Sequence, residues 1–167
     1  YMKPDSLRKE AERMEIEERV KGKKEIGYVT GELEPEMFER RDFLVNLEEL
    51  LKEGGEAKLI FSKVRDKTEE PLDLSTGIER LYEENPGITS LLESYPENLQ
   101  LYLNAKRPNK HYAYFGEEGF LEEEEHSSEE SPLTYFYKCR DFATLAKGKI
   151  QEIIDNGKNL KKVEVQQ

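Results

Sequence analysis

The chain has 167 residues, the size of one ordinary domain. It contains 26 Lys and Arg residues and 37 Asp and Glu residues, which give a formal net charge of −11. This balance argues against a broad nucleic-acid-binding surface, because such surfaces are basic. No apolar run approaches the roughly 20 residues of a membrane-spanning helix. We therefore expect a cytoplasmic, acidic protein without membrane contact.

Cysteine usage and the start of the chain narrow the class further. The single cysteine, Cys139, excludes an internal disulfide framework and a paired-cysteine zinc site, and we expect it to pack as a small apolar group. No secretion signal is visible at the start. The chain begins Tyr1-Met2, which suggests a piece of a longer protein.

The first segment, residues 6–21, is expected to be a charged helix with Ser6 as its N-cap. Such a helix packs lightly on a domain, because its apolar stripe is thin. It is alternatively a connector from an upstream domain, or one side of a dimer contact. We place a helix or linker at residues 1–22 and a single α/β domain at residues 23–167. The stripe consists of Leu7, Ala11, Met14 and Ile16.

The next three expected elements form a strand–helix–strand unit. A short strand covers residues 23–30, and Pro35 opens a helix that Gly54-Gly55 stops. The run from Ala57 to Phe61 lacks alternation, which fits a strand covered on both faces. The helix has one buried face, since its apolar residues recur at spacings of three and four: Phe43, Leu44, Leu47, Leu50 and Leu51.

The second half of the chain predicts further helices and several strands. A helix over residues 77–95 breaks at Asn85-Pro86, since proline lacks a backbone donor and restricts the residue before it. The last helix has Asp141 as its cap and Gly157 as its stop, and a lysine-rich tail follows it. The expected strands are 99–103, 111–115, 120–124 and 133–139.

Helices that cross between strands predict parallel pairs, and the later hairpins predict antiparallel pairs. The fold class is therefore α/β, with a single mixed β-sheet flanked by helices and preceded by an N-terminal helix.

The order of elements and the segment 106–128 together resemble a known family. They are similar to one half of a phospholipase D-like domain. That family's motif places a His, a Lys and an Asp, in this order, on a strand–turn–strand unit. His111 matches the family His, whereas Glu118 stands where the family has Asp and Ala113 stands where the family has Lys.

The resemblance implies a specific chemistry and a specific departure from it. In the family the His attacks phosphorus, the Lys neutralises the charge that develops on the oxygens, and the carboxylate orients the imidazole. Two motif copies meet in the active site, so an enzyme with one copy requires a homodimer. Ala113 cannot replace an ammonium group. The resemblance therefore implies a degenerate, non-catalytic scaffold, and in similar sensor proteins a DNA-binding domain precedes such a module through a helix.

The candidate ligand-binding residues are Lys106, Arg107, Lys110 and His111. This basic turn stands out in an acidic chain and suits an anionic ligand or an acidic partner. Its structural explanation is a charged turn that pairs with nearby glutamates, with His111 hydrogen-bonded inside the sheet. If the chain is an enzyme, His111 and Glu118 are the catalytic residues.

The acidic stretch 117–130, which includes His126, is expected to be a solvated loop. Consecutive glutamates in a strand alternate faces, so no preorganised metal site is specified. We expect no metal and no cofactor.

The function that follows is a non-catalytic regulatory, ligand-binding or partner-binding module, the C-terminal part of a larger regulator, with self-association in a homodimer. The alternatives are a homodimeric phosphodiesterase or nuclease that uses His111, and an adaptor that presents the acidic loop to a protein partner. Direct nucleic-acid binding by this segment is not expected.

Overall fold

The computed structural model describes residues 4–63, 74–105, 108, 110–123 and 133–165. The described residues form one seven-stranded sheet in the order β6-β5-β4-β1-β2-β3-β7. Strands β1, β2 and β3 are parallel to one another, and the other four join antiparallel to their neighbours. The fold class expected from the sequence, an α/β domain with one mixed sheet and an N-terminal helix, is confirmed.

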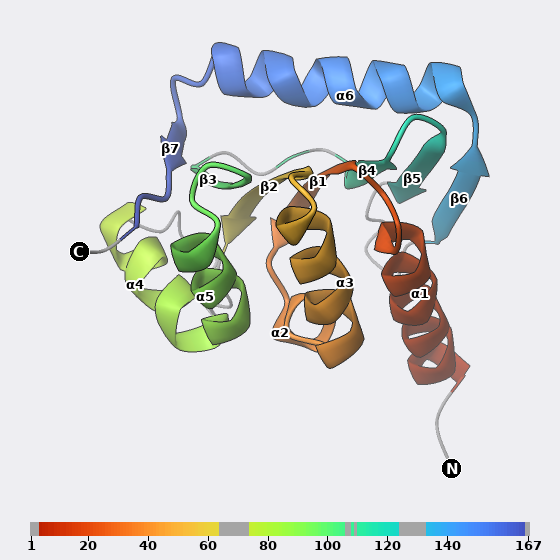
Figure 1. Ribbon diagram of the computed structural model, residues 1–167, viewed down its shortest axis with the longest axis horizontal. Helices are drawn as coiled ribbons and strands as arrows, with labels where there is room; N and C mark the ends of the chain where they lie inside the picture. The colour runs from red at the N-terminus through yellow and green to blue at the C-terminus, as the bar shows by residue number, and fades with distance from the viewer. Residues whose placement is uncertain (1–3, 64–73, 106–107, 109, 124–132, 166–167) are drawn as a thin grey trace.

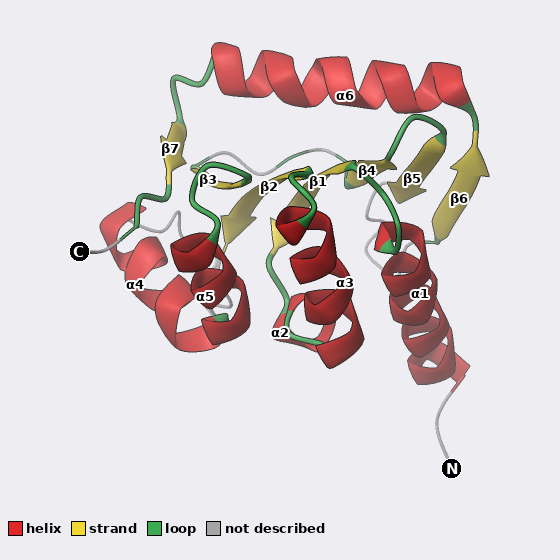
Figure 2. Cartoon of the chain, viewed as in Figure 1, coloured by secondary structure: helices red, strands yellow, loops and turns green. Residues whose placement is uncertain are grey.

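Helices cover both faces of the sheet unequally (Figure 1, Figure 2). Helix α6 crosses one face, whereas α1 to α5 lie on the other. The helices are α1 Pro4–Val20, α2 Pro35–Phe38, α3 Arg41–Lys52, α4 Leu74–Glu84, α5 Pro86–Ser94 and α6 Arg140–Asp155. The strands are β1 Glu25–Glu32, β2 Glu56–Lys63, β3 Leu99–Asn104, β4 Tyr112–Phe115, β5 Gly119–Glu123, β6 Thr134–Lys138 and β7 Leu160–Lys162.

The two faces of the sheet carry separate apolar cores because side chains alternate along each strand. The larger core lies beneath α1 to α5 and contains Leu59 and Phe61 of β2. The smaller core lies beneath α6 and contains Ile60 of the same strand with Ala146 and Ile150 of the helix. Strand β2 is thus buried on both faces, as its uninterrupted apolar run predicts.

Helix α1 packs on the domain through other residues than its sequence predicts. Of the expected stripe only Ile16 is buried; Val20 completes the contact, while Leu7 and Met14 are 53% and 55% exposed. The helix also begins at Pro4, so Ser6 lies inside it and is not its cap. Charged side chains strengthen the packing. Arg40 donates hydrogen bonds to the buried Glu17 and to Glu10. The domain boundary placed at residue 22 stays a prediction.

The helix predicted from Pro35 to Gly54 is divided into α2 and α3. A residue between the two helices contacts α5. The carboxylate of Glu39 accepts hydrogen bonds from the backbone N–H groups of Gly87 (2.6 Å) and Ile88 (3.0 Å), at the first turn of α5. Burial raises the pKa of Glu39, and these two donors partly offset the rise. The break therefore joins α2 and α3 to α5.

The C-terminal tail differs most from expectation. Residues 160–162 form β7, which pairs antiparallel with β3 and extends the sheet. No alternation marks so short a strand, and its lysines are as suited to the end of a helix. The cap of α6 is Cys139, and Asp141 lies in the first turn instead. The predicted break at Asn85-Pro86 is confirmed, because α4 ends at Glu84 and α5 begins at Pro86.

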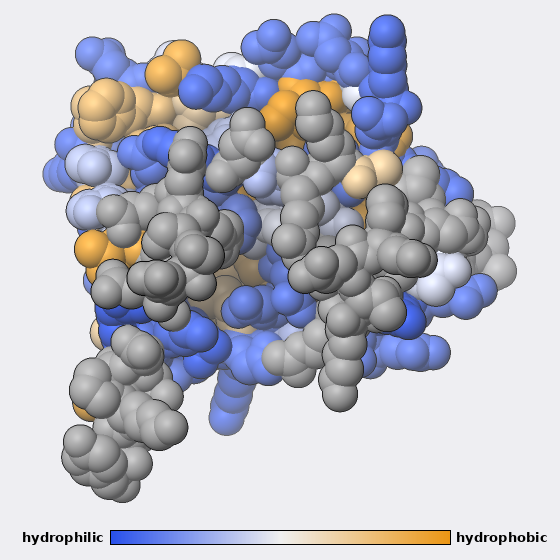
Figure 3. Space-filling model, turned by 180° about the vertical axis from the view of Figure 1, so that it is seen from behind, coloured by the Kyte–Doolittle hydropathy of each residue, from blue (hydrophilic) through white to orange (hydrophobic). Residues whose placement is uncertain are grey.

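One face of the molecule is mostly polar. Figure 3 shows the side turned away from the viewer in Figure 1, where hydrophilic side chains dominate the coloured surface and the hydrophobic areas are small and separate. None of the helices in the described part of the chain is long and apolar enough to cross a bilayer.

Candidate functional site

His111 lies at the carboxyl end of β1. Strand β4 runs antiparallel to β1 with Val29 opposite Tyr112, so the residue before Tyr112 reaches the end of β1. In open α/β sheets, ligands bind at the carboxyl ends of the parallel strands. The sequence-predicted histidine thus occupies the edge where a site is expected.

Both ring nitrogens of His111 have hydrogen-bond partners. The backbone N–H of Gly31 donates to Nε2 over 3.0 Å, so this nitrogen carries no proton. The proton is then on Nδ1, which donates to the Glu123 carboxylate over 2.7 Å. The backbone N–H of Glu123 in turn donates to the His111 carbonyl. The imidazole therefore ties together β1, the start of β4 and the end of β5.

More carboxylates lie behind Glu123. Glu12 of α1 is half-buried, accepts a hydrogen bond from the Thr134 side chain and is close enough to Glu123 to feel its charge. Burial raises the pKa of Glu12; Arg8 lowers it and Glu123 raises it further. Burial also raises the pKa of Tyr28, and Glu123 and Glu12 add to that effect. His111 is thus linked through Glu123 to the helix that begins the chain.

Ala113, in the place of the family lysine, is fully buried. It pairs with Tyr28 of β1 and Leu121 of β5, and it belongs to the core that Ile16 and Val20 of α1 also enter. A cation at this position would point into apolar packing beneath α1. The position is part of the core.

The other sequence-predicted site residues that the structure describes, Lys110 and Glu118, are paired with other side chains. Lys110 is paired with Glu122 over 2.9 Å, which matches the structural explanation of the basic turn. Lys106 and Arg107 lie outside the described residues, as does His126. Glu118 is exposed and lies 3.7 Å from Lys138, and the carboxylate that holds His111 is Glu123 instead. Among the described residues no cluster of His, Cys, Asp and Glu is arranged to hold a metal ion.

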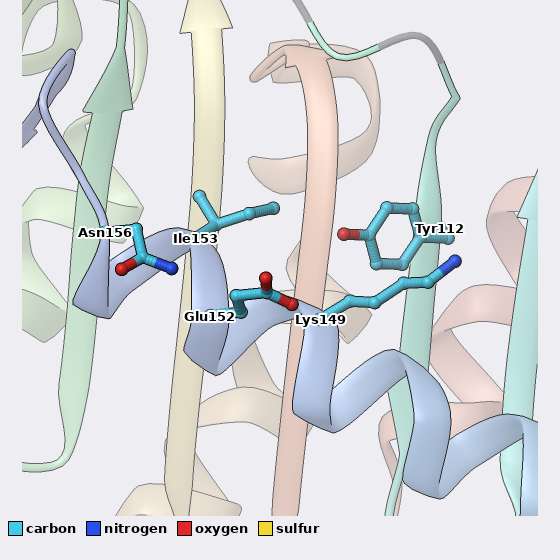
Figure 4. Close-up of a pocket in the computed structure, with 5 residues that line it drawn as sticks. All are labelled: Tyr112, Lys149, Glu152, Ile153 and Asn156. Carbon is cyan, nitrogen blue, oxygen red and sulfur yellow. The ribbon is translucent and has the colours of Figure 1, made fainter.

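A cavity of about 380 Å³ lies beside this edge, between α6 and the sheet. Figure 4 shows Tyr112 leaving β4 with its hydroxyl directed toward Ile153, while Lys149 and Glu152 extend from α6. Asn156 completes the lining at the end of the helix. Burial raises the pKa of Tyr112, and the charge of Glu152 adds to the rise.

The sequence did not predict the residues that surround His111 or those that line the cavity. Glu123 stood in a run of glutamates that gave no reason to prefer one of them. The spacing of Lys149, Glu152, Ile153 and Asn156 places them on one side of a helix, which the sequence does show. Nothing in the sequence indicates that this side turns toward Tyr112.

No protein-family model and no curated protein matches the sequence. Solved structures do. TrmBL2, an archaeal chromatin protein with a novel mode of DNA binding, superposes with a TM-score of 0.57 and 12% identity over 86% of this chain and 48% of its own. Nuc from Salmonella typhimurium, a phospholipase D family member, superposes with a TM-score of 0.54 and 9% identity over 91% of this chain and 90% of its own.

The fold is phospholipase D-like. A third structure agrees: the phosphatidylserine synthase of Haemophilus influenzae Rd KW20 has a TM-score of 0.54 and 15% identity over 90% of this chain and 36% of its own. This chain thus spans about half the length of TrmBL2 and about a third of the synthase. At these identities the likeness extends to the fold alone, and the family's His–Lys–Asp motif is matched here at His111 only.

Proposed function

We propose that this phospholipase D-like chain is a non-catalytic binding module that recognises a small ligand or a partner protein within a larger regulator. The burial of Ala113 carries the proposal, because it leaves the phosphodiester chemistry of the family without its cation. A second observation supports it. A histidine nucleophile needs a free lone pair, and the Nε2 lone pair of His111 accepts the Gly31 N–H.

The regulatory part of the proposal draws on the N-terminal helix and on one structural neighbour. TrmBL2 is a DNA-binding chromatin protein, and this chain covers about half of it. Helix α1 enters the core of the domain and is linked to Glu123. A ligand bound at the carboxyl end of the sheet would thereby act on whatever precedes α1. Self-association in a homodimer is part of the proposal, and sedimentation velocity over a range of concentrations measures it.

The proposal is tested by hydrolysis of a chromogenic phosphodiester, bis(p-nitrophenyl) phosphate, over a range of pH. The expected rate equals that of the buffer, for the unmodified chain and for His111→Ala alike. Hydrolysis that the unmodified chain performs and His111→Ala loses would overturn the proposal. It would favour the alternative, a homodimeric phosphodiesterase, which the His111–Glu123 pair itself supports as an oriented imidazole.

Binding is tested separately with thermal unfolding in the presence of phosphate compounds, sugars and amino acids. A ligand that binds the native state raises the melting temperature in proportion to its occupancy. If no compound does so, the module binds a protein, and an acidic adaptor is then the better description.

A further inference from the structure

The cavity between α6 and the sheet contains four polar side chains that have no side-chain partner among the described residues. Within the described part of the chain, Tyr112, Lys149, Glu152 and Asn156 make no side-chain hydrogen bond or ion pair. This contrasts with the neighbouring surface of α6. There, Lys147 is paired with Glu25 and Arg140 with Glu117. The charged groups that line the cavity thus differ from these two paired residues of the same helix.

Lys149 and Glu152 are three residues apart on α6, a spacing at which opposite charges often pair. They do not pair here; Figure 4 shows the Lys149 side chain running beneath the Tyr112 ring, while Glu152 points into the space between Ile153 and Tyr112. The cavity therefore presents one cation and one anion separately, with a phenol and an amide beside them.

The presence of one separate cation and one separate anion determines which ligand chemistry fits the cavity. An anion such as phosphate would neutralise Lys149 but would be repelled by Glu152. A simple amine would neutralise Glu152 but would be repelled by Lys149. A neutral ligand would shield both charges from water without compensating either. A molecule with its own ammonium and carboxylate groups compensates both.

We propose that this cavity binds a small zwitterion of the α-amino acid class. The inference rests on the proposed binding function and names its ligand. The ligand carboxylate pairs with Lys149 and its ammonium with Glu152, while Tyr112 and Asn156 supply further hydrogen bonds and Ile153 contacts an aliphatic side chain. The volume of about 380 Å³ lies within the range of small-molecule sites, roughly 300 to 1,000 Å³.

The test is isothermal titration of the full chain with L-leucine and with two analogues that each lack one charge. The analogues are 4-methylpentanoate, without the ammonium, and 3-methylbutylamine, without the carboxylate. L-leucine is expected to bind, and each analogue to bind at least about tenfold more weakly, since charge-assisted hydrogen bonds are the stronger ones. Equal binding of an analogue, or no binding of L-leucine, would overturn the assignment.

Matched variants locate the site. Lys149→Gln and Glu152→Gln are each expected to weaken L-leucine binding at least about tenfold. Lys161→Gln and Glu83→Gln remove the same charges from exposed positions outside the cavity and are expected to leave affinity unchanged. All four positions are exposed, so melting temperatures should stay close to that of the unmodified chain. Binding that survives both cavity variants would refute the site.

The outcomes separate this inference from the function on which it rests. If inorganic phosphate or glucose stabilises the chain and L-leucine does not, the zwitterion assignment fails and the binding function stands. If His111-dependent hydrolysis of the phosphodiester appears, the binding function itself fails.

Discussion

The Nε2 atom of His111 accepts a hydrogen bond from the backbone N–H of Gly31, 80 positions away in the sequence. The bond closes the carboxyl end of β1 against the start of β4. The imidazole connects these two segments of the sheet. We therefore expect its removal to lower the free energy of unfolding and to leave phosphodiester hydrolysis unchanged.

Replacing His111 with Ala is expected to destabilise the chain by about 1 to 3 kcal/mol, since the Gly31 N–H loses its acceptor and Glu123 its donor. Urea unfolding followed by circular dichroism measures the change. Lys110→Ala, which breaks an exposed pair with Glu122, is the control and should change stability by less than about 0.5 kcal/mol. Equal effects of the two substitutions would contradict the bridging role.

Restoring the family lysine should not restore the chemistry. Ala113→Lys places an ammonium group in a fully buried core position, and the expected cost is at least about 3 kcal/mol. Ala11→Lys, on the exposed side of α1, is the matched control and should be tolerated. A soluble, folded Ala113→Lys protein with phosphodiesterase activity would show that the position faces the site after all.

The raised pKa of Glu12 gives stability a defined dependence on pH. Because the pKa of Glu12 is higher in the folded chain than in the unfolded chain, the folded state binds more protons. The contribution of Glu12 is therefore fully present below the ordinary glutamate pKa and is lost as the pH rises through the raised value. Glu12→Gln should remove that loss, so the variant should match or exceed the unmodified chain at neutral pH.

The measurement is the melting temperature at a series of pH values from about 5 to 7, a range that lies above the ordinary glutamate pKa. The difference between Glu12→Gln and the unmodified chain should grow as the pH rises. Glu18→Gln, which alters an exposed glutamate of the same helix, supplies the baseline. A difference that shrinks with rising pH has the wrong sign.

Arg40 holds α1 on the domain, and its loss should expose the cost of burying Glu17. Arg40→Ala is expected to destabilise the chain by about 2 to 3 kcal/mol, somewhat below a fully buried pair because Arg40 is 24% exposed. In Arg40→Ala combined with Glu17→Gln, part of the stability should return, since no charge is then left buried. Additive losses in the double variant would mean that the two side chains act independently.

Much of the fold was predictable from local signals. The five apolar residues of α3 and the uninterrupted run of β2 identified a helix face and a buried strand, because periodicity depends only on neighbours in sequence. The interruption at Glu39 and Arg40 was not predictable, since it is fixed by partners on α5 and α1. Strand β7 was not predicted for the same reason, because it is formed through its pairing with β3.

The candidate site was predictable only in part. His111 was singled out from the sequence, and its hydrogen bonds to Gly31 and Glu123 match the structural explanation given for it there. Its carboxylate partner was assigned to Glu118 on the family pattern, whereas the antiparallel register of β4 and β5 brings Glu123 to it. Register follows from the hairpin as a whole, and a sequence motif does not specify it.

One helix connects the two outermost strands of the sheet. Helix α6 leaves β6 at one margin and delivers the chain to β7 at the other. Its 16 residues span about 24 Å, and the six spacings between seven strands amount to about 29 Å, so helix and short linkers together match the width of the sheet. The length of α6 therefore limits the width of the sheet. With one turn removed, the helix would no longer reach from β6 to β7, and the strand at one margin could not pair.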